Sequence, residues 1–269
     1  MPSLLTAVLA GCLLLTAAMA RADDPAPSLR ILAYNIKHGR GMDGKVDLRR
    51  AAAVIAAQNP DLVALQEVDR NCTRSGKVDI AAELGRILGM DHRFAKFMDF
   101  QGGEYGLAVL SRLPITKSVR HQLPAGAEPR CALEVRVRFA ALTTPLSFLS
   151  IHHDWTDAKI RVGQVEALLA ALEGHRHPVI LAGDFNGERD DPSVIRLARS
   201  GWNVLRKDDP AARHTFPSDA PRKEIDFFML RGVPAVHVTH HVVDERLASD
   251  HRPIAAVLTF EKKAGPAAE

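Results

Sequence analysis

The sequence predicts an α/β domain in which buried strands alternate with helices. Residues 29–34 form an apolar run, residues 48–59 have a helical pattern that ends at Pro60, and residues 61–66 form a second apolar run. Two strands joined by such a crossover helix make a βαβ unit, which brings the ends of both strands to one edge of a sheet. The 269 residues, 46% of them hydrophobic, provide a core for one large domain or two small ones.

The later elements continue this alternation. The apolar positions Ile80, Leu84, Ile87 and Leu88 lie on one face of a helix that Gly89 ends. Apolar and charged residues alternate over 133–139, which predicts a strand with one solvent-facing side and antiparallel pairing in the middle of the chain. Further strands are expected at residues 107–110, 146–151, 179–182, 223–230 and 254–260, and further helices at residues 158–173 and about 192–200.

Polar side chains occur where several of these strands end. Asn35 follows the first strand, Glu67 the second, and Asp184 and Asn186 follow the apolar run of residues 179–182. Since Asp184 and Asn186 are two residues apart, both side chains leave the same face of an extended chain. A local Asp-Asn turn is the alternative interpretation of that pair. The same kind of residue at several strand ends favours a shared site, whose oxygen atoms suit a hard divalent cation.

Other polar residues have both a functional and a structural interpretation. Asp226 lies inside the apolar run of residues 225–230, and because a buried carboxylate is costly unless paired, a partner is expected for it. Tyr105 lies among glycines and either fills space or offers its hydroxyl to a ligand. Three basic residues shortly after the second strand either contact an anionic substrate or serve solubility alone: Arg70, Arg74 and Lys77.

Seven short motifs make the sequence resemble the endonuclease/exonuclease/phosphatase superfamily, which has the deoxyribonuclease-I-like fold. No single motif is specific to this superfamily, but the seven motifs together, in the right order and at workable spacing, are specific to it. The resemblance covers about residues 29–260. The motifs are Asn35, Leu65-Gln66-Glu67-Val68, Tyr105-Gly106 with Leu110-Ser111-Arg112-Leu113-Pro114, Ile151-His152, Gly183-Asp184-Phe185-Asn186, Ile225-Asp226-Phe227 and Ser249-Asp250-His251.

The resemblance implies a four-layer α/β sandwich, in which two packed mixed β-sheets are flanked by helices. It also implies a Mg²⁺-dependent phosphoesterase site at one rim, with Mn²⁺ as an alternative cation. Glu67 resembles the main metal ligand, and Asn35 and Asp250 complete or support the metal shell. His152 and Tyr105 match the family's residues that contact the phosphate.

The same resemblance implies catalytic roles for four further residues. Asp184 matches the residue that orients or deprotonates the attacking water, and Asn186 is its companion. His251 matches a histidine that acts as a base or stabilises the transition state, and Asp226 matches the acid that orients it. His153 departs from the pattern, since an apolar residue is usual there, and is interpreted as a histidine at the rim.

The function expected from these residues is that of a metal-dependent phosphoesterase that hydrolyses a phosphodiester or phosphomonoester by direct attack of water. The alternatives are an endo- or exonuclease acting on DNA or RNA, and a non-catalytic adaptor that kept the fold. A net charge of +3, without a basic run, and 5% aromatic residues lean against a dedicated nucleic-acid surface and offer no evident stacking platform. A nucleic acid, a phospholipid headgroup or a small phosphodiester remain candidate substrates. A monomer without a stable protein partner is expected.

The N-terminal residues predict that the protein is exported. An apolar run over residues 4–19, followed by small residues, predicts a signal peptide over residues 1–22, cleaved after Ala20 or Ala22. A leader at residues 23–28 and a disordered tail at residues 261–269 would flank the domain. The protein is then secreted or periplasmic, or membrane-anchored if the signal is not cleaved.

Two groups of residues outside the motifs also have a functional and a structural interpretation: the cysteines that remain after cleavage of the signal peptide, and a cluster of histidines near residue 240. In an oxidising compartment Cys72 and Cys131 are hypothesised to form a disulfide, with two buried free thiols as the alternative. His237, His240 and His241 are interpreted as surface residues rather than metal ligands.

Overall fold

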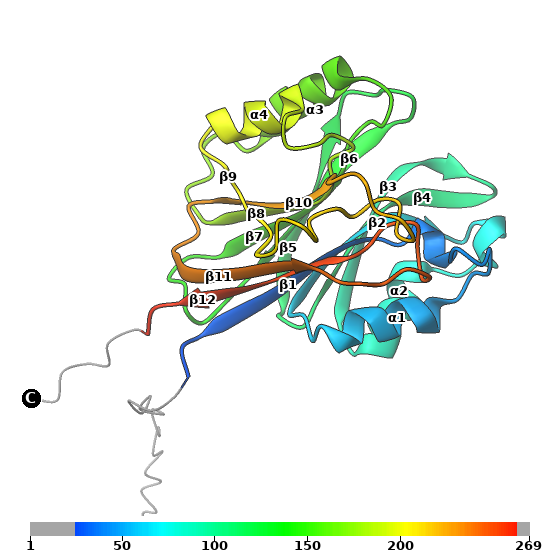
Figure 1. Cartoon of the computed structure of the whole chain (residues 1–269), viewed down its shortest axis with the longest axis horizontal. Helices are drawn as coiled ribbons and strands as arrows, with labels where there is room; N and C mark the ends of the chain where they lie inside the picture. The colour runs from blue at the N-terminus through cyan, green and yellow to red at the C-terminus, as the bar shows by residue number, and fades with distance from the viewer. Residues whose placement is uncertain (1–24, 263–269) are drawn as a thin grey trace, which may run out of the picture.

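Two six-stranded mixed sheets pack face to face, with helices on their outer faces (Figure 1). The computed structural model describes residues 25–262, so the expected signal peptide and most of the expected tail lie outside the described residues. The first sheet has the order β11-β12-β1-β2-β4-β3 and the second the order β5-β6-β7-β8-β10-β9. The four-layer fold expected from the resemblance is therefore confirmed.

The first sheet consists of β1 (Ser28–Asn35), β2 (Leu62–Arg70), β3 (Asp91–Phe100), β4 (Gly103–Ser111), β11 (Ala235–Val242) and β12 (Ile254–Phe260). The second sheet consists of β5 (Ile115–Leu123), β6 (Arg130–Val137), β7 (Leu146–His152), β8 (Val179–Asp184), β9 (Asn203–Val204) and β10 (Asp226–Arg231). The helices are α1 (Leu48–Ala57), α2 (Ile80–Leu88), α3 (Ala158–Ala171) and α4 (Pro192–Arg199), with short 3₁₀ turns at Lys37–Gly39 and Thr73–Ser75.

Three hydrophobic cores hold these layers together. Between the sheets, side chains such as Leu62 of β2 and Phe148 of β7 pack against each other. A second core lies between the first sheet and helices α1 and α2, and includes Ile55. A third lies between the second sheet and helices α3 and α4, and includes Leu168. Strands β7 and β8 are buried along their whole length, and β1 and β2 along most of theirs, as parallel strands covered on both faces usually are.

The strand register brings polar strand ends to one rim. Strands β1 and β2 are parallel, with Asn35 opposite Gln66, and β7 and β8 are parallel, with His152 opposite Asp184. Strand β10 runs antiparallel to β8 and places Asp226 opposite Asp184. A hydrogen bond also joins the two sheets near this rim. Gln66 Nε2 of β2 donates to Ser150 Oγ of β7 at 3.0 Å. The ends of strands from both sheets therefore meet.

The strands in the middle of the chain pair antiparallel, as predicted. Glu134 of β6, however, is buried and does not face solvent. Strand β6 pairs antiparallel with β5 and β7, whereas the Glu134 side chain is 0% exposed. Its carboxylate accepts hydrogen bonds from Ser147 Oγ at 2.6 Å and Arg136 Nε at 2.8 Å, and lies 2.8 Å from His121 Nε2. Charged partners thus make a buried acid acceptable where an alternating pattern suggested solvent.

The hypothesis of a disulfide between Cys72 and Cys131 is wrong, because both are buried free thiols. Each sulfur approaches a different backbone carbonyl: Cys72 Sγ lies 3.2 Å from Glu104 O, and Cys131 Sγ lies 3.9 Å from Lys96 O. Burial raises the pKa of both thiols to about 11, which keeps them protonated and unreactive at neutral pH.

The interpretation of three surface histidines is also corrected at one position. His237 and His241 are exposed on β11, but His240 is fully buried. Its ring packs 5.2 Å from the Phe228 ring, and burial lowers its pKa to about 2. Strand alternation explains the difference, because neighbouring residues of β11 face opposite sides of the sheet.

None of the helices within residues 25–262 is long and apolar enough to span a membrane.

We expect Glu134→Gln to destabilise the fold by about 1–3 kcal/mol at pH 7, because it removes a charged hydrogen-bond acceptor from a buried network. Burial alone would raise the pKa of Glu134, but hydrogen bonds from His121, Ser147 and Arg136 outweigh it and lower the pKa. The stabilisation from the ionised group is therefore present above the pKa of an unfolded Glu, about 4.3, and is lost as pH falls. Urea unfolding at pH 7, 5 and 3.5 measures the difference.

The exposed Glu173→Gln serves as the control and should match the wild type at every pH. A difference between wild type and Glu134→Gln that stays constant on acidification would contradict the assignment of the effect to the ionised carboxylate.

Candidate active site

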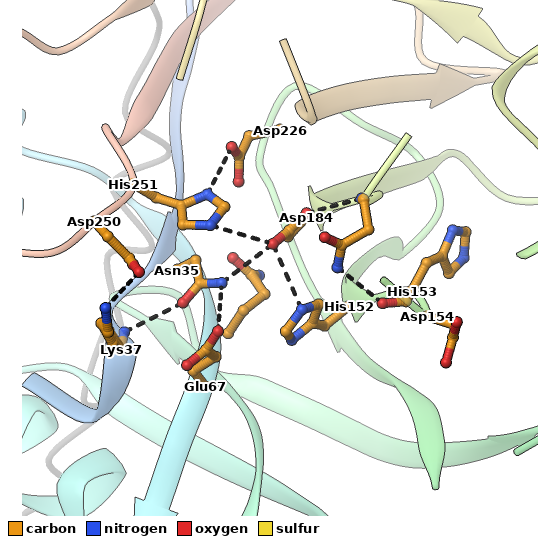
Figure 2. Close-up of polar contacts among 12 residues, drawn as sticks. Asn35, Lys37, Glu67, His152, His153, Asp154, Asp184, Asp226, Asp250 and His251 are labelled. Carbon is orange, nitrogen blue, oxygen red and sulfur yellow. Dashed lines mark hydrogen bonds and ion pairs between the residues drawn. The ribbon is translucent and has the colours of Figure 1, made fainter. Parts of the chain in front are cut away.

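A pocket of about 330 Å³ opens at the rim where the strands of both sheets end. Its lining includes Glu67, Tyr105, His152, Asp184, Asn186, Asp250 and His251. Figure 2 shows Glu67, His152, Asp184, Asp250 and His251 gathered around Asn35, with Asp226 beside His251. All nine site residues expected from the sequence thus lie in or beside one pocket.

Glu67 is aimed into the pocket by an irregularity in β2. The pairing of β2 with β4 shifts register between Leu65 and Val68, and Glu67 has a φ of 56°. A side-chain-bearing residue in the left-handed region costs about 1–3 kcal/mol, which the surrounding sheet must offset. Such bulges turn a side chain away from the regular alternation of the strand. The irregularity therefore directs a carboxylate at the rim from within the strand, between the buried Gln66 and Val68.

Asn35 joins two of the carboxylates. Its Nδ2 donates to Glu67 Oε1 and to Asp184 Oδ2, both at 3.1 Å, while its Oδ1 accepts from the backbone N–H of Lys37 at 3.2 Å (Figure 2). The amide nitrogen thus faces both acids. In this arrangement Asn35 positions the carboxylates, and it could offer its oxygen to a cation only after the amide rotates.

The residues fit a hard divalent cation at Glu67. Within residues 25–262 no lysine or arginine forms a salt bridge with this carboxylate, and burial together with the nearby negative charge of Asp250 raises its pKa. Asp250 itself lies 2.6 Å from Lys37 Nζ. An acid that is partly buried, close to a second acid and without a salt bridge to a lysine or arginine is stabilised by a bound cation, and oxygen donors suit Mg²⁺ or Mn²⁺.

Asp226 finds the partner that its burial requires. Its Oδ2 lies 3.0 Å from His251 Nδ1 and accepts a hydrogen bond from Thr215 Oγ1, and its backbone carbonyl accepts from Lys207 Nζ at 2.7 Å. On the other side of the ring, His251 Nε2 lies 3.6 Å from Asp184 Oδ2. Ligand atoms of the two aspartates and His251 all lie within 4.8 Å of one another, a spacing that could also hold a metal ion.

The acids surrounding His251 control its charge. Burial would lower the pKa of the imidazole, but the carboxylates of Asp226 and Asp184 outweigh burial and raise it to about 10. Burial and the proximity of Asp226 raise the pKa of Asp184 to about 7, although His251 opposes this. At neutral pH the pocket therefore holds an imidazolium beside a carboxylate that can accept a proton.

Asp184 is fixed by the turn that follows β8. Its Oδ1 accepts from the backbone N–H of Asn186 at 2.8 Å, and Asn186 Nδ2 donates to His153 O at 3.0 Å. The local turn and the shared site, which the sequence posed as alternatives, therefore coexist. His153 itself is not at the rim: its ring is fully buried 5.4 Å from Phe185, so that interpretation is wrong.

His152 and Tyr105 offer neutral polar groups to the pocket. His152 Nε2 lies 3.5 Å from Asp184 Oδ2, and its Nδ1 has no hydrogen-bond partner within residues 25–262. Burial, assisted by the positive charge of Arg130, lowers the pKa of His152. Burial raises the pKa of Tyr105, so its hydroxyl stays protonated and able to donate.

The structure adds two arginines and a tryptophan to this pocket. Arg130, only 1% exposed, forms an ion pair with Glu128 at 2.9 Å and packs 4.9 Å from the Phe97 ring. Its position at the start of β6 gave no sequence signal. Of the three basic residues after Glu67, Arg74 lines the pocket. Trp155, two residues after the His-His pair, also lines it.

A sequence model of the endonuclease/exonuclease/phosphatase family matches residues 32–251. An endonuclease/exonuclease/phosphatase from Beutenbergia cavernae has a similar structure, with 25% identity, a TM-score of 0.74, and coverage of 90% of this chain and 73% of that one.

Two structures of lower identity share the fold. The mannosyl-6-phosphatase of Bacteroides thetaiotaomicron has 19% identity and a TM-score of 0.70, with coverage of 86% of this chain and 100% of that one. TDP2 of D. rerio, humanized by 14 mutations, has 20% identity and a TM-score of 0.68, with coverage of 87% and 99%.

We expect Asp226→Asn to lower the pKa of His251 by about 1–3 units, because a carboxylate in contact with the ring favours its charged form. NMR titration of the histidine ring protons in EDTA measures this change. In the wild type His251 should stay protonated at pH 8.

The exposed Asp219→Asn is the control and should leave this titration unchanged. An imidazole that loses its proton near pH 6.5 in the wild type would refute the charge assignment.

Proposed function

Because the chain belongs to the endonuclease/exonuclease/phosphatase family, whose members hydrolyse phosphoesters, we propose that it is a metal-dependent phosphoesterase that acts by direct attack of water on a phosphodiester or phosphomonoester. The observation that carries this proposal is the partly buried Glu67 carboxylate, which lines the pocket. It shares the Asn35 amide with Asp184, and no lysine or arginine forms a salt bridge with it within the described chain. A cation and a proton acceptor are thus accommodated side by side.

Glu67 and Asp250, supported by Asn35, would hold Mg²⁺ or Mn²⁺. When bound, the cation supplies positive charge for the oxygens of the phosphoryl group and the leaving oxygen, on which negative charge builds up. Lys37 Nζ lies 2.6 Å from Asp250 Oδ2 and orients this carboxylate.

Asp184 is the proposed proton acceptor for the attacking water. A carboxylate with a pKa of about 7 is well matched to this task at neutral pH, and Asn186 fixes its orientation. The water oxygen bonds to phosphorus, one of its protons passes to Asp184, and the ester P–O bond breaks with its electron pair leaving on the ester oxygen.

His251 is proposed as the cationic stabiliser rather than the base, since it already carries a proton at neutral pH. Asp226 holds its Nδ1, so that Nε2 is directed at the reacting group. His152, Tyr105 and Arg130 are proposed as further contacts to the phosphoryl oxygens, because preorganised donors stabilise charge that develops in the transition state.

Nuclease activity is the second candidate function, and a non-catalytic adaptor the third. The presence of the whole expected residue set in one pocket argues against the adaptor. The buried arginine in the pocket, near an exposed aromatic side chain, is compatible with an ester of a nucleotide.

We also propose export to the periplasm or the medium, on the basis of residues 1–22. N-terminal sequencing of the exported protein should begin at Arg21 or Asp23. Recovery of the intact N-terminus with membranes would support the uncleaved anchor instead.

The proposed function is tested by assaying bis-p-nitrophenyl phosphate, plasmid DNA and a phospholipid panel with Mg²⁺ or Mn²⁺ and with EDTA. Turnover should require the metal. Glu67→Gln should lower kcat/KM at least about 10²-fold, because the pocket loses the charge that holds the cation. Calorimetric titration with Mn²⁺ should show weakened binding in the same variant.

The matched control is Glu83→Gln on α2, whose partly exposed carboxylate pairs with Arg86 and lines neither of the two pockets beside His251. It should retain full activity. Undiminished turnover in EDTA, or in a folded Glu67→Gln variant, would refute the metal-dependent mechanism.

A further inference from the structure

Trp155 is the most exposed of the large apolar side chains described, with 62% of its surface accessible. Isolated exposed hydrophobic residues are common, so exposure alone carries no conclusion. The position of Trp155 is what distinguishes it. The side chain lines the active-site pocket and also a second pocket of about 330 Å³ beside it.

The backbone around Trp155 is firmly held although its side chain is not covered. The preceding Asp154 is buried, and its carboxylate accepts from the backbone N–H groups of Ala127 at 2.8 Å and Thr156 at 2.8 Å. The N–H of Asp154 donates to Gln164 Oε1 at 2.9 Å. These bonds tie the segment after β7 to the loop before β6 and to α3. Trp155 is thus presented at a fixed place on the rim.

The two pockets form a continuous path past the reacting centre. Both are lined by Trp155, Asn186, Phe216 and His251. The Phe216 ring lies 4.8 Å from the His251 ring, so an aromatic surface continues from the proposed phosphate site to the junction. A substrate bound at this centre can therefore place one of its ester groups against aromatic rings.

The far side of the second pocket is acidic. Glu188, Asp190 and Asp191 line it, together with Lys223 and Arg161, and Arg161 is already paired with Asp191 at 2.6 Å. Another phosphate would meet these carboxylates unfavourably, whereas sugar hydroxyl groups can donate hydrogen bonds to them. The second pocket therefore suits a hydroxyl-bearing neutral group and not a continuing polyphosphate chain.

We infer that Trp155 is a specificity residue that stacks on a planar ring of the substrate, and that the substrate is a small phosphodiester of a nucleoside rather than a polynucleotide. The phosphate lies in the active-site pocket, the base lies on Trp155, and the sugar faces the acidic pocket. This inference rests on the proposed phosphoesterase function. It also supplies the stacking surface that the low aromatic content of the sequence did not suggest.

The kinetic test compares two diesters with the same leaving group, thymidine 5′-(p-nitrophenyl phosphate) and methyl p-nitrophenyl phosphate. Trp155→Ala should lower kcat/KM for the thymidine ester about 5–150-fold, the effect typical of one base–aromatic stack, and leave the methyl ester unchanged. Trp155→Phe should retain most of the activity on the thymidine ester. Melting temperatures check that all three proteins are folded.

Other outcomes would overturn the inference. An equal loss on both esters would mean that Trp155 contacts the leaving group or only supports the loop. No loss on either ester would remove Trp155 from substrate binding. Plasmid DNA cleaved more efficiently than the thymidine ester, with a steep loss in added salt, would identify a polynucleotide as the substrate.

A binding measurement separates this inference from the proposed function. The chain has two tryptophans, and the other, Trp202, is only 3% exposed. Thymidine 5′-monophosphate should quench the fluorescence of Trp155 in EDTA, inorganic phosphate at the same concentration should not, and Trp155→Phe should lose the quenching. Quenching without turnover of any ester would refute the phosphoesterase function alone. Turnover of the esters without quenching would refute the stacking role alone.

Discussion

One amide joins the two halves of the site. Asn35 ends β1 in the first sheet, and its nitrogen donates to Glu67 from the neighbouring strand and to Asp184 from the second sheet. Both acids are poorly solvated, so each needs such a donor to remain in place. The position of the proton acceptor relative to the proposed cation ligand therefore depends on how the two sheets pack. The large core between the sheets determines that packing.

Because the site depends on the packing of the two sheets, the rim can hold residues with strained backbones and buried polar side chains. Glu67 adopts a left-handed backbone at a register shift, and Asn186 has a φ of 48° in the turn after β8. Parts of the fold outside the proposed chemistry stabilise both residues. Paired strands flank Glu67, and Asn186 Nδ2 donates to the backbone carbonyl of the buried His153. The hydrophobic layers thus stabilise an arrangement of charges that would not assemble by itself.

Short-range patterns predicted the α/β class and the polar residues at several strand ends, whereas the four-layer arrangement and the rest of the site were implied by the resemblance to the family. Apolar runs mark strands buried on two faces, and polar residues just after them must reach the common edge. The errors concern what packs against a residue from elsewhere in the chain. The alternating pattern predicted a solvent-facing Glu134, but His121 and Arg136 surround its carboxylate. His240 was predicted to be exposed, but it lies on the buried side of β11. Arg130 and Trp155 carried no local pattern, since only tertiary structure brings the start of β6 and the end of β7 to one pocket.

The ion pair between Lys37 and Asp250 has a consequence for the charge balance of the pocket. With Asp184 ionised, four carboxylates gather there, those of Glu67, Asp184, Asp226 and Asp250, while Lys37 and the His251 imidazolium supply two positive charges. The formal charge that remains is two negative charges, which one divalent cation would match if the proposed metal binds there. Arg130 and Arg74 line the same pocket and would attract an anionic substrate.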